Sequence, residues 1–501
     1  MEDVFVEAFE LGINELCSLI DNKKINVIEL TQSAIDRIKQ IENKINSFIS
    51  FDEESVLKRA LAVQEKLNKE EFKSPLAGIP MALKDNICTK DMKTTCGSKM
   101  LKDYLPLFDA TAVSKLYESG AIVLGKTNLD EFAMGSTTLY SYFKKTANPW
   151  NNGRIKDVLC DGAAACVASG EVIYALGTDT GGAVRQSASL GGVVGLKPTY
   201  GLVSRYGLVE CASSFDQIGP IARSVSDCAL VLNIISGKDP MDSTSIEPKS
   251  KDYAGWLRKN TENNTQDIKD IRIGIPKELI TNSCIDIDED VRGRFFDAVD
   301  FFEKNTSCCE EFSFQAFNYA LPVYCIISFA EISSSMGKYE GIKFGYRADG
   351  VKDLVDLYKR TRDEGFGTEV KKRIIIGTYV LCSKQYEKYY RKALKLRRLI
   401  SDELRKVFER YDAIITPTIP VAATKYMNYQ NDPKKEYECD ILTSIANIAG
   451  LPAISIPCGK DSDGYPIGLQ LIGNYFSEDV LLKIAHSFEQ SMKFENNRLN
   501  I

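Results

Sequence analysis

The sequence contains almost no histidine. Its 501 residues include one, His486, near the C-terminus. Metal sites built from histidine clusters are therefore excluded, and so is Ser-His-Asp or Cys-His catalysis unless His486 takes part. Apolar residues around His486 recur at helical spacing, which favours a packing role for this side chain. We expect neither a metal nor a cofactor.

Long apolar runs and paired cysteine motifs are also missing. No run approaches the roughly 18 residues that are needed to cross a membrane, and the acidic N-terminus lacks the basic and apolar regions of a signal peptide. The 14 cysteines are scattered without a C-x-x-C pair, which is typical of reduced thiols in the cytoplasm. The sequence thus predicts a cytoplasmic protein without a membrane partner.

The charge balance is mildly acidic. With 63 basic and 69 acidic residues the formal net charge is −6, so a nucleic-acid-binding surface over the whole chain is not expected. A basic stretch at residues 384–406 leaves two interpretations open. It is either an RNA-facing surface or, as we favour, a solvated helix face.

Hydrophobic patterning predicts an α/β protein. Residues 1–70 have helical periodicity, and two short apolar runs on either side of a helical segment form a β-α-β pattern. Because parallel strands need covering helices, we expect both faces of the sheet to be covered. Without repeats or a linker, residues 1–501 are predicted to form one domain with a helix-rich excursion at 285–410. The expected strands lie at 77–86, 121–128, 271–276, 414–418 and 453–458, and the β-α-β helix at 110–119.

Three separated segments resemble the amidase-signature family. They are PLAGIPMALKDN at 75–86, the glycine-rich segment at 175–209 and SSFDQIGP at 213–220. Residues 364–383 and 445–459 are similar to the A-type subunits of glutamyl-tRNA(Gln) amidotransferases in particular. The resemblance implies a large mixed β-sheet sandwiched between helical layers. It also implies a role in protein biosynthesis with B- and C-type partner subunits, and leaves direct tRNA binding open.

The family hydrolyses amides without histidine. A serine nucleophile passes its proton through a bridging serine in a cis peptide to a neutral lysine, and backbone N–H groups stabilise the oxyanion. By resemblance, Lys84 stands at the position of the lysine base. The glycine turn Thr180, Gly181 and Gly182 stands at the oxyanion hole.

Both hydroxyls of this proton relay are replaced. Ala183 occupies the nucleophile position and Leu159 the bridging position. A methyl group cannot attack a carbonyl and a leucine cannot pass a proton, so the sequence predicts a pseudo-amidase with a binding or subunit role. The alternative is an active amidase or glutamine-dependent amidotransferase subunit in which Cys160 is the nucleophile, with its pKa lowered by Lys84. Ser187 and Ser189 are interpreted as packing or capping residues.

A substrate pocket is implied by three further residues. In the A-type subunits, the amino acid part of glutamine is held by a tyrosine, an arginine and an aspartate, and the resemblance places them at Tyr324, Arg373 and Asp440. A guanidinium suits an α-carboxylate, and an aspartate suits an α-ammonium. Alternatively, Arg373 is one basic residue on a helix face and Asp440 a helix cap. The expected ligand is glutamine or another small amide or amino acid.

Overall fold

The computed structural model describes residues 10–151, 158–250, 252–255, 268–280, 285–429 and 432–492. Eleven strands in this part of the chain form one sheet, in the order β1-β3-β2-β4-β6-β5-β10-β11-β9-β7-β8. The strands are β1 Phe48–Phe51, β2 Pro80–Lys84, β3 Ile122–Thr127, β4 Tyr174–Asp179, β5 Val194–Lys197, β6 Gln217–Ala222, β7 Arg272–Pro276, β8 Cys308–Phe312, β9 Ala413–Pro417, β10 Ala453–Lys460 and β11 Pro466–Gly473.

The sheet is mixed. Strand β2 runs parallel to β3 and β4, whereas β4 to β9 are joined through antiparallel pairs. All residues of β2, β3 and β4 are buried, which explains why these strands are continuous apolar runs rather than alternating ones. The predicted α/β class with a large mixed sheet is confirmed, as are the five expected strands and the helix between β2 and β3.

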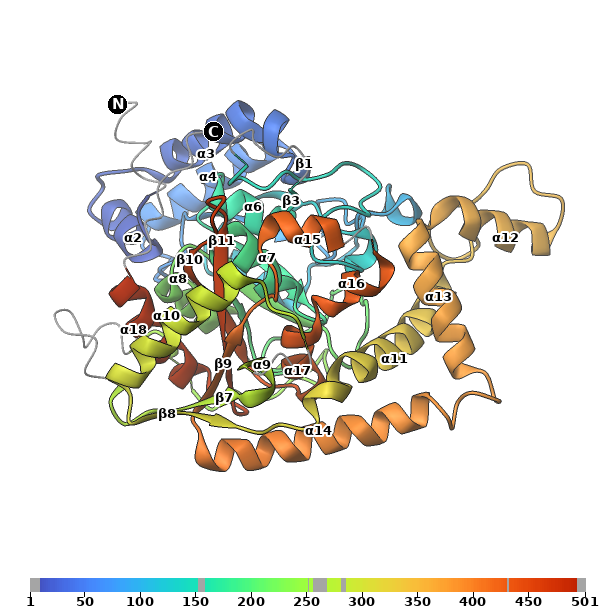
Figure 1. Ribbon diagram of the computed structural model, residues 1–501. Helices are drawn as coiled ribbons and strands as arrows, with labels where there is room; N and C mark the ends of the chain where they lie inside the picture. The colour runs from blue at the N-terminus through green and yellow to red at the C-terminus, as the bar shows by residue number, and fades with distance from the viewer. Residues whose placement is uncertain are drawn as a thin grey trace.

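Helices cover the sheet (Figure 1). Helices α6 and α7 pack on each other and on β4, α8 packs on β5 and β6, and α18 packs on α8, β10 and β11. The helices are α2 Ile13–Asp21, α3 Val27–Ile45, α4 Glu53–Asn68, α5 Thr111–Glu118, α6 Gly162–Ala168, α7 Ala183–Gly191, α8 Val225–Ile235, α9 Lys277–Ile280, α10 Glu289–Asn305, α11 Phe317–Ser335, α12 Leu354–Gly365, α13 Thr368–Leu381, α14 Tyr390–Arg410, α15 Ala423–Tyr429, α16 Pro433–Glu438, α17 Ile441–Ala449 and α18 Glu478–Met492.

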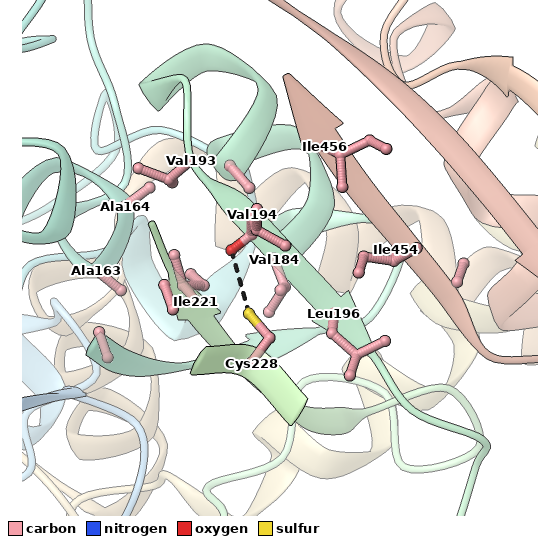
Figure 2. Close-up of a cluster of buried hydrophobic side chains, with 14 of the residues drawn as sticks. Ala163, Ala164, Val184, Val193, Val194, Leu196, Ile221, Cys228, Ile454 and Ile456 are labelled. Atoms are coloured by element: carbon pink, nitrogen blue, oxygen red, sulfur yellow. Dashed lines mark hydrogen bonds between the residues drawn. The ribbon is translucent and has the colours of Figure 1, made fainter. Parts of the chain in front are cut away.

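The core contains small and branched side chains that let helices approach the strands closely. Figure 2 shows Ala163 and Ala164 of α6 and Val184 of α7 in one cluster with Val194 of β5 and Ile221 of β6. From α8, the thiol of Cys228 donates a hydrogen bond to the Val194 carbonyl at 3.7 Å (Figure 2). Close packing of this kind fixes the start of α7 relative to the sheet.

The expectation that no apolar segment is long enough to cross a membrane is wrong for helix α11. With the short 3₁₀ turn that follows it, the segment Phe317–Lys338 is long and apolar enough to cross a membrane by length and composition alone. However, half of its apolar window is buried inside the fold, where α11 packs on α13, α14 and α17. This is the pattern of a core helix.

Helices α11 and α13 make an unusually close contact. A Cβ atom on Gly377 of α13 would lie 1.9 Å from the carbonyl oxygen of Phe329 on α11, so only glycine fits. The contact presses α13 against the body of the molecule, while α12 lies at the outer end of the excursion (Figure 1). Because of this contact, Tyr324 of α11 and Arg373 of α13 can line one cavity at the end of β4.

Candidate functional site

A narrow cavity of about 30 Å³ lies where β4 ends and α7 begins. Helices α11, α13 and α15 to α17 complete its walls. This volume holds about one water molecule, so a larger ligand requires lining side chains to move. The lining residues are Ala133, Gly135, Ser136, Tyr140, Thr180, Gly181, Gly182, Ala183, Tyr324, Arg373, Tyr426, Tyr437 and Asp440.

The turn between β4 and α7 is built around two glycines. Gly182 has φ +139°, and a Cβ atom there would lie 2.2 Å from the Thr443 hydroxyl. A Cβ on Gly181 would lie 2.3 Å from the Tyr324 hydroxyl, and the Gly181 carbonyl accepts a hydrogen bond from the Thr443 hydroxyl at 2.7 Å. The first N–H groups of a helix have no partner within the helix, so this turn can present backbone donors to the cavity.

Thr180 is tied to a buried carboxylate. Its hydroxyl donates to Asp216 at 2.6 Å, and the same carboxylate accepts backbone hydrogen bonds from Cys211 and Ala212. Burial raises the pKa of Asp216 to about 6, against the opposing effect of these hydrogen bonds. The network fixes the first residue of the turn, directly after β4.

A buried arginine anchors the head of α7, a feature that the sequence analysis missed. Arg185 forms a bidentate pair with Asp179 at the end of β4, at 2.9 and 3.0 Å, and both side chains are fully buried. It also donates to the Thr443 carbonyl and the Asn447 amide oxygen of α17. The available signal was the pair of opposite charges, Asp179 and Arg185, within a glycine-rich segment that is otherwise uncharged from 172 to 196.

Ala183 is the first residue of α7 and its side chain lines the cavity. Lys84, at the end of β2, does not line it. Its ammonium lies 2.8 Å from the carboxylate of Asp161, and both side chains are 2% exposed. Asp161 caps α6 by accepting a hydrogen bond from the Ala163 N–H. Burial raises the pKa of Asp161, and the charge of Lys84 opposes that rise.

Leu159 and Cys160 lie outside the cavity. Leu159 is buried and forms an isolated antiparallel bridge with Ala147. Cys160 is fully buried, and its thiol lies 3.8 Å from the Ser187 carbonyl, to which it donates. The expectation that Lys84 lowers the pKa of this thiol is wrong, because burial and the neighbouring Asp161 raise it.

Tyr324, Arg373 and Asp440 line the cavity together, although they come from α11, α13 and the start of α17. Arg373 is 5% exposed, so it does not belong to a solvated basic face. Its Nε donates to Glu369 at 2.7 Å. Asp440 occupies the cap position of α17 but makes no capping hydrogen bond. Instead it accepts one from the Gln186 amide at 2.9 Å.

Six lining residues were not predicted from the sequence: Ala133, Gly135, Ser136, Tyr140, Tyr426 and Tyr437. The Tyr437 hydroxyl donates to Glu369 at 2.8 Å, so it shares the carboxylate that holds Arg373. A single tyrosine in a polar segment does not belong to a periodic pattern, so the sequence gives no indication that it lines a cavity. Among the described residues, no group of three or more His, Cys, Asp or Glu side chains could hold a metal ion.

His486 has the position that the sequence predicts. It lies on α18, is 9% exposed, and its Nδ1 lies 3.5 Å from the carboxylate of Glu489. It is not among the lining residues of the cavity.

Comparisons with known proteins agree with this architecture. The family model described as Amidase matches residues 29–482. The A-type subunit of the glutamyl-tRNA(Gln) amidotransferase from Thermoanaerobacter pseudethanolicus is 48% identical over 489 residues, which cover 98% of each chain. The crystal structure of the corresponding protein from Thermotoga maritima has a TM-score of 0.76 at 38% identity and covers 98% of this chain and 96% of that one. Native peptide amidase from Stenotrophomonas maltophilia has a TM-score of 0.75 at 25% identity over 98% of each chain. The chain therefore belongs to the amidase family.

Proposed function

We propose that this protein is a member of the family similar to the A-type amidotransferase subunits that has lost serine-dependent amide hydrolysis and acts as a binding or structural subunit. One observation carries the proposal. The residue at the head of α7, beside the glycine turn and facing the cavity, is Ala183. Amide hydrolysis by this family's route needs a hydroxyl at that place.

The ion pair between Lys84 and Asp161 supports the same conclusion. A lysine that accepts a proton must be a neutral amine. The Lys84 nitrogen lies 2.8 Å from the buried carboxylate of Asp161, so it is already engaged in an ion pair within the fold. Lys84 is thereby engaged in stabilising the fold.

The cysteine alternative receives no support from the geometry. The Cys160 side chain is fully buried, lies outside the cavity lining, and has a raised pKa. A reactive cysteine needs thiolate character and access to the substrate. We therefore favour loss of hydrolysis over a repurposed nucleophile.

The cavity retains groups that suit the backbone of an amino acid. Arg373 offers a guanidinium to an α-carboxylate and Asp440 a carboxylate to an α-ammonium, with Tyr324 between them and the glycine turn. We propose glutamine or a related small amide or amino acid as the ligand. Arg373 donates to Glu369 through Nε, which leaves its terminal NH2 groups for the carboxylate of a ligand.

The similar proteins suggest which partner subunits this protein binds. Their names describe one of several subunits of a glutamyl-tRNA(Gln) amidotransferase, so we propose B- and C-type subunits as partners, in the cytoplasm and in protein biosynthesis. Because the similarity covers nearly the whole chain, we infer that this protein binds its partner subunits through the same surface as these relatives.

The test is ammonia release from glutamine and from simple amides, with the purified chain alone and with B- and C-type subunits. We expect no release above that of a Lys84→Met variant. Isothermal calorimetry with glutamine then reports binding, which should weaken in Arg373→Met. Sustained ammonia release that Lys84→Met abolishes would disprove the loss of hydrolysis. Loss of the release in Cys160→Ser would identify the cysteine as the nucleophile.

A further inference from the structure

A second, much larger hollow lies on the excursion side of the molecule. It has a volume of about 830 Å³ and shares no lining residue with the cavity at α7. We call it the lateral groove, and it is lined by residues from three segments: 99–104, 208–210 and 338–347. Its volume lies within the range of about 300–1,000 Å³ that is typical of binding sites.

The walls of the lateral groove are held in place by contacts across it. The Tyr346 N–H donates to the Met100 carbonyl at 2.7 Å, and the Lys99 ammonium lies 4.2 Å above the Tyr346 ring. Gly345 has φ +84°, and a Cβ atom there would lie 2.7 Å from the Met100 sulfur. The two loops therefore fit each other closely, and the groove is a formed site.

The groove and its surroundings expose large apolar side chains. Phe344 in the groove is 53% exposed, and Ile342, a residue of the segment 338–347 that does not line the groove, is 52% exposed. Leu105 and Leu107, which follow the segment 99–104, are 52% and 87% exposed. Exposed apolar side chains in and near a hollow that also has charged residues are typical of a protein–protein contact. A small ligand inside the groove would leave most of these side chains uncovered.

The charged residues of the lining are mostly basic. The lining contains five basic and two acidic residues. The basic ones are Lys99, Lys102, Lys338, Lys343 and Arg347, and the acidic ones are Asp103 and Glu210. This excess is opposite in sign to the net charge of the chain, which is −6. Complementary charge determines which partners can approach, so an acidic partner is favoured.

We propose that the lateral groove binds an extended segment of a partner subunit in which an apolar or aromatic residue is flanked by carboxylates. The proposal rests on the proposed subunit role, but not on the loss of hydrolysis. The bound segment would also contact a hydrophobic cluster that the groove and the cavity share. Met100 and Tyr339 of the groove belong to the same cluster as Ala133, which lines the cavity, and Phe329, whose ring lies 5.2 Å from the Arg373 guanidinium.

The experiment uses the full chain co-expressed with the B- and C-type subunits of the same cell. A photoreactive residue, Phe344→p-benzoylphenylalanine, should cross-link to an acidic segment of one of them. The double variant Phe344→Ala, Lys343→Glu should weaken assembly by about tenfold or more. Both residues are exposed, so the melting temperature of the isolated chain should not change. Matched controls are Phe296→p-benzoylphenylalanine and Phe296→Ala, Lys304→Glu on α10, which lies far from α12 in Figure 1.

The outcomes separate the two proposals. If the complex forms but the Phe344 variants cross-link and bind no differently from the Phe296 variants, the groove proposal is wrong and the subunit role stands. If no complex forms, both are wrong. Cross-linking to a basic segment, or to added tRNA in place of a protein partner, would also overturn the groove proposal.

Discussion

At the scale of single residues, the most informative contact is the buried pair of Lys84 and Asp161. Removing one partner of a buried ion pair leaves an uncompensated charge, which costs about 3–5 kcal/mol. Asp161→Asn should lower the free energy of unfolding by about that amount, measured by urea denaturation. Asparagine keeps the capping ability for α6, so the loss reports the charge and not the cap.

The matched control for this prediction is an exposed pair of the same type. The ammonium of Lys93 lies 3.0 Å from Asp103, whose side chain is 71% exposed. Because solvent screens exposed pairs, Asp103→Asn should leave the urea midpoint unchanged. Equal effects of the two variants would mean that the pair at Lys84 contributes no more than a surface contact.

A second buried lysine gives a prediction about pH. Burial, together with the charge of Arg185, lowers the pKa of Lys197 from 10.5 to about 7. Between these two values the unfolded chain binds a proton that the folded chain lacks. The contribution of Lys197 to stability therefore rises with pH across this window, by up to about 1.4 kcal/mol per pH unit. Below the folded pKa the ammonium is buried and destabilises the fold in full.

Lys197→Met removes this titration while keeping a side chain of similar length. The variant should gain stability relative to the wild type at pH 6.5, and the gain should shrink steadily towards pH 9. Comparing urea midpoints of the two proteins at each pH cancels the contribution of the buried cysteines, which both share. Two parallel curves would show that Lys197 does not titrate in this range.

At the scale of secondary structure, the turn before α7 depends on glycine. An alanine at position 182 would adopt φ +139° and place its Cβ against the Thr443 side chain. The conformation alone costs about 1–3 kcal/mol, so Gly182→Ala should destabilise the fold by at least this amount in urea unfolding.

The control is Gly293, which lies inside α10 with nothing within 4 Å of the position that a Cβ atom would take. There the same substitution should stabilise by about 0.5–1 kcal/mol, and a loss at that site would contradict the helix argument.

The sequence predicted those elements whose signal is local. Strands β2 and β3 are buried on both faces and appear as apolar runs between polar turns, so they could be recognised without knowledge of their neighbours. Strand β8 was missed. Its sequence is Cys-Cys-Glu-Glu-Phe, and only Phe312 is buried. The strand lies at the edge of the sheet and owes its conformation to pairing with β7.

The site shows the same limit. A family resemblance could place Lys84 and Ala183 at their motif positions, but not the contacts between distant segments. The pairing of Lys84 with Asp161, the burial of Cys160 and the Arg185 network depend on how α6, α7 and α17 pack. That residues 1–501 form one domain stays a prediction.

At the scale of the whole molecule, the fold is that of an amidase, and we propose that the reacting groups have been lost. If the scaffold is otherwise intact, restoring those groups should restore the reaction. The variant Leu159→Ser, Asp161→Gly, Ala183→Ser returns both hydroxyls and releases Lys84 from its ion pair. We expect it to liberate ammonia from glutamine, in complex with the B- and C-type subunits, at least about a hundredfold faster than the wild type.

The control for restored hydrolysis is the same triple variant with Lys84→Met, which lacks the base and should be inactive again. Ala183→Ser alone should stay inactive, because the lysine is still paired with Asp161 and no bridging hydroxyl links it to the nucleophile. Glutamine binding measured by calorimetry must be equal in all four proteins, so that a difference in rate reports chemistry and not occupancy. A triple variant that binds glutamine but releases no ammonia would show that the scaffold differs from an active amidase beyond positions 159 and 183.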